Sequence, residues 1–278
     1  MANPMLVSLS LALRGVQAVS PDLAGKWAER IFFTPPHRPL AAGDREVLAR
    51  ARAFTVRSEG KPVRAWQWEG GTGPKVLLVH GWGGAGGRFS AFVEPILAAG
   101  CSAVTYDGPG HGLTGKGRSS APELARALAA VVAQVGAPDA VIAHSLGGVV
   151  TALALAEGLA PRRVALVASG AHPIWFVDQF AALLGLNART AAALRTHSER
   201  RIRFDWNDLE VLPVFARAKG SALVVHDRGD ETVPVGHGED IAAAWPGAEL
   251  VLTDGLGHRG VLRDPAIVKR IVQFVTTR

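Results

Sequence analysis

The chain has 278 residues, of which 48% are hydrophobic and 19% are charged, and its formal net charge is +6. This composition excludes a disordered chain and suffices for one large α/β core with a small insertion. The basic residues are scattered without interleaved aromatic residues, so the charge indicates a solvated surface, and we expect no nucleic-acid partner.

Cys101 is the only cysteine, which excludes an intrachain disulfide and a multi-cysteine metal site. We therefore predict a cytoplasmic protein that uses neither a metal nor another cofactor. The apolar run at residues 5–13 lacks a preceding basic residue and is followed directly by Arg14, so it is interpreted as a surface helix and not as a signal peptide. It is too short to span a bilayer, and we expect no stable membrane insertion.

The first 50 residues are predicted to form an N-terminal helical extension. After the helix at 5–13, a second helix is expected at 22–33, and three prolines within residues 35–39 then break the pattern. Segments 52–57 and 62–68, separated by a Glu-Gly-Lys turn, are typical of a β-hairpin. This hairpin would place antiparallel strands ahead of the parallel units.

From Lys75 onward, apolar runs alternate with helical stretches, which is typical of an α/β fold with a mostly parallel sheet and helices on both faces. The expected strands are 75–80, 101–106, 139–144, 163–168, 221–226 and 248–253, and the expected helices are 88–99, 121–135, 147–158, 237–244 and 264–276. The sheet core would span residues 51–170 and 219–278. The interval between strands 163–168 and 221–226 is far longer than one crossover needs, so residues 171–218 are predicted to form a small helical cap.

Residues 139–151 predict a short apolar strand, a sharp turn at Ser145 and a helix opening at Gly147. Such a turn lifts a serine hydroxyl clear of the sheet and aims the helix N-terminus at it. It requires small residues two positions before and two after the serine, and these are Ala143 and Gly147. Because Ala143 replaces the commoner glycine, the motif alone does not identify Ser145 as a nucleophile, and the evidence must come from the surrounding loops.

The loop His80–Gly84 follows an apolar strand and is rich in glycine. Its glycines allow backbone N–H groups to point inward, so the amides of Trp82 and Leu146 are predicted to form an oxyanion hole. An ordinary strand-to-helix turn is the alternative. A phosphate-binding loop is disfavoured because the required glycine and lysine spacing is missing.

Two further histidines lie near the predicted site. His111 could be mistaken for a base, but the loop Asp107–Gly112 is better explained as a glycine-rich turn in which Asp107 caps its own backbone. His144 precedes the serine on the strand. Because neighbouring strand side chains point to opposite faces, His144 is expected to pack away from the substrate.

The last two loops supply an acid and a base. Asp230 is the preferred acid because it lies within the turn, whereas Asp227 follows its strand immediately; Asp227 and Glu231 remain candidates. His258 lies past the last strand on a glycine turn that could bring it back to the serine. Ser145, Asp230 and His258, in this chain order, predict a triad in which the acid orients the imidazole and the imidazole takes the hydroxyl proton.

With these motifs the chain resembles the α/β-hydrolase superfamily, and within it the serine carboxylesterases and lipases. The resemblance covers residues 52–278 and rests on His80–Gly83, Asp107–Gly112, Ala143–Gly148, Asp230–Pro234 and Gly257–His258. It implies the α/β-hydrolase fold and the Ser–Asp–His triad. Relatives with an aspartate nucleophile are excluded by Ser145.

We therefore predict a metal-free serine hydrolase that cleaves small to medium carboxylic esters, its small-molecule partners, through an acyl-enzyme. Trp82 and three aromatic residues of the cap, Trp175, Phe176 and Phe180, are candidates to line the acyl pocket. One alternative is the same triad acting on amide, thioester or carbon–carbon bonds, or in perhydrolysis. Another is a non-catalytic ligand receptor on the same fold. The sequence does not indicate the oligomeric state.

Overall fold

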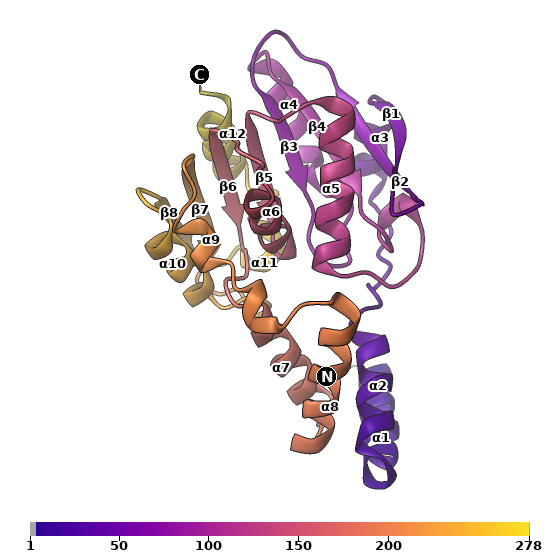
Figure 1. Cartoon of the computed structure of the whole chain (residues 1–278). Helices are drawn as coiled ribbons and strands as arrows, with labels where there is room; N and C mark the ends of the chain where they lie inside the picture. The colour runs from indigo at the N-terminus through magenta and orange to yellow at the C-terminus, as the bar shows by residue number, and fades with distance from the viewer. Residues whose placement is uncertain (1–3, 278) are drawn as a thin grey trace. The chain divides into compact units, whose positions relative to one another are not determined.

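Strands of the described chain form one eight-stranded sheet in the order β1-β2-β4-β3-β5-β6-β7-β8 (Figure 1). The computed structural model describes residues 4–277. The strands are β1 (Arg52–Ser58), β2 (Lys61–Trp68), β3 (Lys75–Val79), β4 (Ser102–Asp107), β5 (Ala140–His144), β6 (Arg163–Val167), β7 (Ser221–Asp227) and β8 (Glu249–Thr253). The β1–β2 and β2–β4 pairs are antiparallel and the other pairs are parallel, which confirms the predicted α/β class and the hairpin.

The central parallel strands are buried on both faces, as their uninterrupted apolar sequences predict. Along β3, Leu77 and Val79 belong to one apolar cluster, whereas Val76 and Leu78 belong to a second. Successive side chains of a strand point to opposite faces, so the two clusters lie on the two sides of the sheet. Each side must therefore be covered by helices.

Helices cover both faces, as expected. The first cluster includes side chains from α5 (Ala121–Val135), α6 (Leu146–Ala156), α9 (Leu212–Phe215) and α10 (Val235–Ala244). The second includes side chains from α3 (Ala42–Ala49), the 3₁₀ helix η1 (Gly86–Phe89), α4 (Ser90–Ala98) and α12 (Pro265–Thr276). Two short helices, η2 (Gly112–Thr114) and α11 (Gly257–Gly260), lie in the loops after β4 and β8.

The ends of the long helices follow local capping chemistry. Before α5, the Ser120 hydroxyl accepts the Glu123 amide and donates to the Glu123 carboxylate, so Ser120 acts as an N-cap. Before α12, the Asp264 carboxylate accepts the amides of Ala266 and Ile267. Each cap satisfies helix N–H groups that lack an intrahelical partner, and its loss costs about 1 kcal/mol.

The chain divides into two compact units. The larger contains the sheet and comprises residues 35–171 and 211–278, and the smaller comprises the residues up to Thr34 together with residues 172–210. The smaller unit contains α1 (Pro4–Val19), α2 (Pro21–Phe32), α7 (Pro173–Leu183), α8 (Ala188–Ile202) and the 3₁₀ helix η3 (Trp206–Leu209). No helix within residues 4–277 is long and apolar enough to cross a membrane.

These units differ from the expected segments at 1–50 and 171–218. The N-terminal helices pack against the helices of residues 172–210. The helices α2 and α8 are so close that a Cβ on Gly25 would lie 2.5 Å from the Cβ of Ala193. Residues 35–50 belong instead to the larger unit, where the buried Asp44 carboxylate accepts hydrogen bonds from Ser90 and Arg263. That residues 171–218 act as a cap stays a prediction.

Candidate active site

Ser145 is the single residue between β5 and α6, and its backbone is strained. Its φ of 56° and ψ of −125° are unusual for any residue other than glycine, and such strain persists only where surrounding contacts impose it. Here the Ser145 amide donates to the Val167 carbonyl at 3.0 Å, and the Ser145 carbonyl accepts the Gly148 amide at 3.0 Å. These bonds hold the sharp turn that carries the Ser145 hydroxyl.

Small residues around the turn are required sterically. A Cβ on Gly147 would lie 2.3 Å from the Val79 carbonyl oxygen, and a Cβ on Gly81 would lie 2.7 Å from the Ser145 Cβ. Ala143 is fully buried in the first apolar cluster, so the methyl group that replaces the commoner hydrogen is accommodated by packing. The substitution therefore leaves the elbow intact.

His258 lies between Ser145 and Asp230. Its Nε2 atom is 3.0 Å from the Ser145 Oγ, and its Nδ1 atom is 2.8 Å from the Asp230 Oδ2. The three side chains come from the loops after β5, β7 and β8, whose carboxyl ends share one edge because these strands are parallel. The structure thus brings the three predicted triad residues together.

The Asp230 carboxylate is buried and held in place from both sides. Its Oδ1 accepts the amides of Thr232 and Val233 at 2.8 and 2.9 Å, while Oδ2 faces His258. The Nε2 of His226 lies 3.5 Å from Oδ2 but only 2.8 Å from the Val233 carbonyl, which is its closer partner.

Burial alone would raise the Asp230 pKa, but His226, His258 and the Val233 amide outweigh burial and hold the pKa well below its usual range. Asp230 is therefore ionised at neutral pH and accepts the Nδ1–H of His258. That tautomer leaves the Nε2 lone pair directed at the serine hydroxyl.

Asp227 has a different set of partners. Its Oδ1 accepts the Gly229 amide at 3.0 Å, and its Oδ2 accepts the Thr253 hydroxyl and the Leu256 amide at 2.8 and 2.9 Å. Burial, which would raise its pKa, is outweighed by these bonds, so the pKa is lowered. Asp227 thus fastens the loop that leads to His258, as expected for a residue tied to loop amides, and Glu231 is exposed.

The loop His80–Gly84 passes directly against Ser145 through Gly81. The Gly84 amide donates to the Gly81 carbonyl at 3.0 Å, closing a tight turn around Trp82. The His80 Nε2 accepts the Gly108 amide at 3.0 Å, so its Nδ1 carries the proton donated to the Gly81 carbonyl at 2.8 Å. Trp82 therefore lies on a loop that is held beside Ser145, and Leu146 is the first residue of α6.

The turn after β4 has the structure expected from its sequence. The Asp107 carboxylate accepts the Leu113 amide at 2.6 Å and the Gly86 amide at 2.7 Å. The His111 Nδ1 donates to the Pro109 carbonyl at 2.8 Å, and its ring packs edge-on to Trp82 at 5.1 Å between centroids. His111 thus supports the loop around Trp82 and makes no described contact with Ser145.

Buried histidines should make stability depend on pH. Burial first, then repulsion from neighbouring histidines, lowers the pKa values of His111 and His144 from 6.5 to about 3. Between these values the unfolded chain binds protons that the folded chain does not, so stability is lost as pH falls below 6.5.

Urea unfolding at pH 7 and pH 5 tests this expectation. His111→Asn removes one such titration, so its loss of unfolding free energy over this interval should be roughly 2 kcal/mol smaller than that of the wild type. Equal losses in the two proteins would mean that folded His111 does take up a proton.

The three pocket aromatics predicted from residues 171–218 lie on α7 in the smaller unit. The rings of Trp175 and Phe176 are 5.0 Å apart, and Phe180 packs on Phe32 of α2 with a centroid distance of 5.2 Å. All three side chains are half-buried. Phe180 thus takes part in the packing of its own unit, and the assignment of these residues to an acyl pocket stays a prediction.

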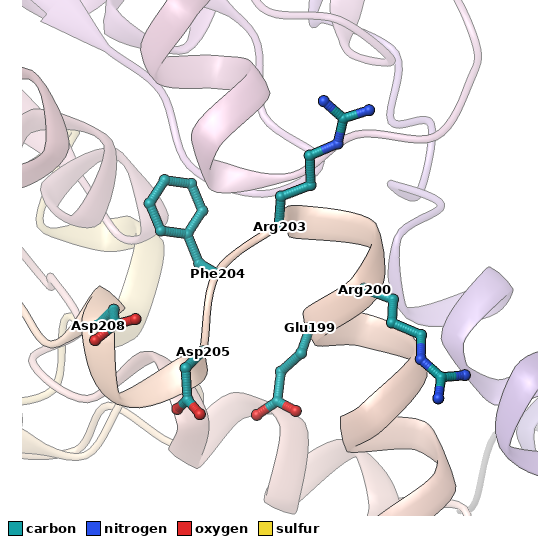
Figure 2. A pocket seen from close by; sticks show the side chains of 6 residues that line it. All are labelled: Glu199, Arg200, Arg203, Phe204, Asp205 and Asp208. Carbon is teal, nitrogen blue, oxygen red and sulfur yellow. The ribbon is translucent and has the colours of Figure 1, made fainter.

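The smaller unit also contains an open cavity of about 410 Å³ between α8 and η3 (Figure 2). Its lining residues are Glu199, Arg200, Arg203, Phe204, Asp205 and Asp208. No serine, cysteine or histidine is among them, and no described triad residue lines this cavity. Within residues 4–277, no group of three or more His, Cys, Asp or Glu side chains is placed to hold a metal ion.

Residues 76–271 match the family model described as the alpha/beta hydrolase family. The pimeloyl-[acyl-carrier protein] methyl ester esterase of Aromatoleum aromaticum is 26% identical over 239 residues, covering 69% of this chain and 94% of that protein. The dihydrolipoyllysine-residue acetyltransferase component of the acetoin cleaving system of Pseudomonas putida is 38% identical over 109 residues. That match covers 38% of this chain and only 29% of the Pseudomonas protein.

A solved esterase from Exiguobacterium antarcticum shares the fold. The two structures superpose with a TM-score of 0.61 at 15% sequence identity, over 81% of this chain and 100% of the esterase. At this identity the likeness concerns the fold alone.

Proposed function

Since the chain belongs to the alpha/beta hydrolase family, we propose that it is a serine hydrolase that cleaves small to medium carboxylic esters through an acyl-enzyme. The observation that carries this proposal is the unbroken series of contacts from Ser145 through His258 to Asp230. A buried, ionised carboxylate, a correctly oriented imidazole and a half-buried serine with a strained backbone together are the machinery of nucleophilic acyl transfer.

In the proposed reaction, the His258 Nε2 takes the hydroxyl proton while the Ser145 Oγ attacks the ester carbonyl. The tetrahedral intermediate collapses when His258 returns this proton to the leaving alkoxide, and the acyl group remains on Ser145. A water molecule, deprotonated by His258, then attacks the acyl-enzyme, and collapse of the second intermediate releases the acid and restores the serine. The chain's own side chains supply the nucleophile and the base, so we expect no cofactor.

The developing oxyanion would be bound by the amides of Trp82 and Leu146. Support comes from the closeness of Gly81 to the Ser145 side chain and from the position of Leu146 at the start of α6. Backbone N–H groups held in a tight turn and at a helix N-terminus are suited to this task, because they need not reorganise as charge develops.

The choice of esters is supported by the relative from Aromatoleum aromaticum, whose name describes a methyl ester esterase. Incubation with a fluorophosphonate probe, followed by mass spectrometry, tests the proposal independently of substrate choice. We expect one probe per chain, attached to Ser145, together with hydrolysis of p-nitrophenyl esters. An unlabelled and inactive wild-type protein would refute the proposal.

Hydrolysis rates should peak at short or medium acyl chains and show no interfacial activation. Residues 171–218 are too few to form a large lid domain, so a modest pocket is expected. The measurement is kcat/KM over p-nitrophenyl esters of graded chain length, with concentrations that cross each substrate's solubility limit. A sharp rise in rate at that limit would instead indicate a lipase.

A further inference from the structure

His144, the last residue of β5, makes a contact that the proposed reaction does not by itself require. Its Nε2 atom lies 2.8 Å from the carbonyl oxygen of His258, and the two imidazole rings are 4.7 Å apart with an interplanar angle of 47°. The side chain is 9% exposed. His144 therefore precedes Ser145 directly in the chain and also contacts the backbone of His258.

We propose that His144 is a positioning residue, which holds the backbone of His258 so that the imidazole stays aligned between Ser145 and Asp230. This role rests on the proposed function and deepens it. Three features of the molecule support this role: the direction of the hydrogen bond, the charge of the His144 ring, and the conformational freedom of the loop that carries His258.

The direction of the hydrogen bond is determined by its partner. A backbone carbonyl can only accept, so the His144 Nε2 must carry the proton and donate it. Burial first, and repulsion from His258 second, lower the His144 pKa to about 3. His144 therefore stays neutral at neutral pH, and it can hold the loop without adding a second positive charge when His258 takes the serine proton.

The loop that carries His258 needs such restraint. Gly255 and Gly257 have φ values of 77° and 61°, and His258 lies in α11, a helix of only four residues. Glycine gives the unfolded loop more conformational freedom than other residues, so tethers must select one arrangement. Asp227 fastens the loop at Leu256, and His144 fastens it at His258 itself.

His144, which donates this hydrogen bond, lies on a strand that is held firmly in the sheet. β5 lies inside the sheet, where His144 is in register with Val167 of β6, and the Ser145 amide is bonded to the same residue. Nucleophile and tether are thus anchored on one strand. A small shift of a catalytic group can cost about 10²-fold in rate, so a link that fixes the base relative to the nucleophile has a measurable consequence.

Variants of His144 test this role by distinguishing a side chain whose N–H reaches the His258 carbonyl from one that is polar but too short. Gln at position 144 can place an amide N–H near the position of the imidazole Nε2, whereas Asn is shorter by one methylene and cannot reach the His258 carbonyl. His144→Leu replaces the hydrogen-bonding imidazole with an apolar side chain. The measurements are kcat and KM for p-nitrophenyl butyrate and the rate of fluorophosphonate labelling at Ser145, with urea unfolding to show that each variant is folded.

We expect Asn and Leu to lower kcat and the labelling rate about 10²-fold with little change in KM, and Gln to recover most of the loss. Equal rates for the Asn and Gln variants, or kcat unchanged in both, would overturn the positioning role while leaving the proposed function in place. A wild-type protein that is neither active nor labelled would refute the proposed function, and this role with it.

Discussion

Replacing Ser145 by alanine is expected to lower kcat for ester hydrolysis by about 10⁶-fold while the protein stays folded. The Oγ that lies 3.0 Å from the His258 Nε2 is the atom that would form the acyl-enzyme, and no other side-chain oxygen is described within reach of this nitrogen. Alanine keeps the same Cβ at this strained position, so the elbow itself should survive.

Steady-state kinetics and urea unfolding of Ser145→Ala check this expectation. Ser119→Ala is a matched control, because Ser119 is fully buried and its hydroxyl has no hydrogen-bond partner among residues 4–277. The control should keep the wild-type rate. If Ser145→Ala kept more than about a hundredth of the wild-type rate, far above the usual cost of removing such a nucleophile, the assignment would be wrong.

Asp230→Asn is expected to lower kcat about 10⁴-fold, because an amide at this position favours the imidazole tautomer in which Nε2 carries the proton. That tautomer cannot accept the proton of Ser145. The substitution preserves the shape of the side chain, and Oδ1 can still accept the amides of Thr232 and Val233, so the loop should persist.

Asp227→Asn is the matched comparison, since it makes the same chemical change three residues earlier. Its Oδ2 accepts two donors, from Thr253 and Leu256, so an amide nitrogen there would face an N–H and loosen the loop before His258. We expect a modest loss of stability and a far smaller loss of kcat. A folded Asp227→Asn more damaged in kcat than Asp230→Asn would reverse the assignment of the acid.

Local sequence patterns predicted the elements of the sheet and the candidate residues. Strands such as β5 (Ala140–His144) and helices such as α5 (Ala121–Val135) lie within two residues of the expected ranges, because alternation and capping act over a few residues. The turn at Ser145 was also visible in the sequence. Its requirement for a small residue at Gly147 is steric, and it is met within the same short segment.

The sequence narrowed the acid to three neighbours, but only the tertiary structure shows which of them contacts His258. Asp227 is the last residue of β7, and Asp230 lies three residues later in the loop that follows. The difference between them arises because Thr253 and Leu256 of the next strand and loop bind Asp227, which leaves Asp230 to face the imidazole.

Apart from the triad, contacts between distant segments were not predicted from the sequence. The hydrogen bond from His144 joins residues 114 positions apart, and Arg263 reaches Asp44 across 219 positions. The packing of the N-terminal helices with residues 172–210 is of the same kind. Periodicity reports which face of an element is buried, but which faces meet depends on the strand order and on side-chain fit, and these exist only in the folded chain.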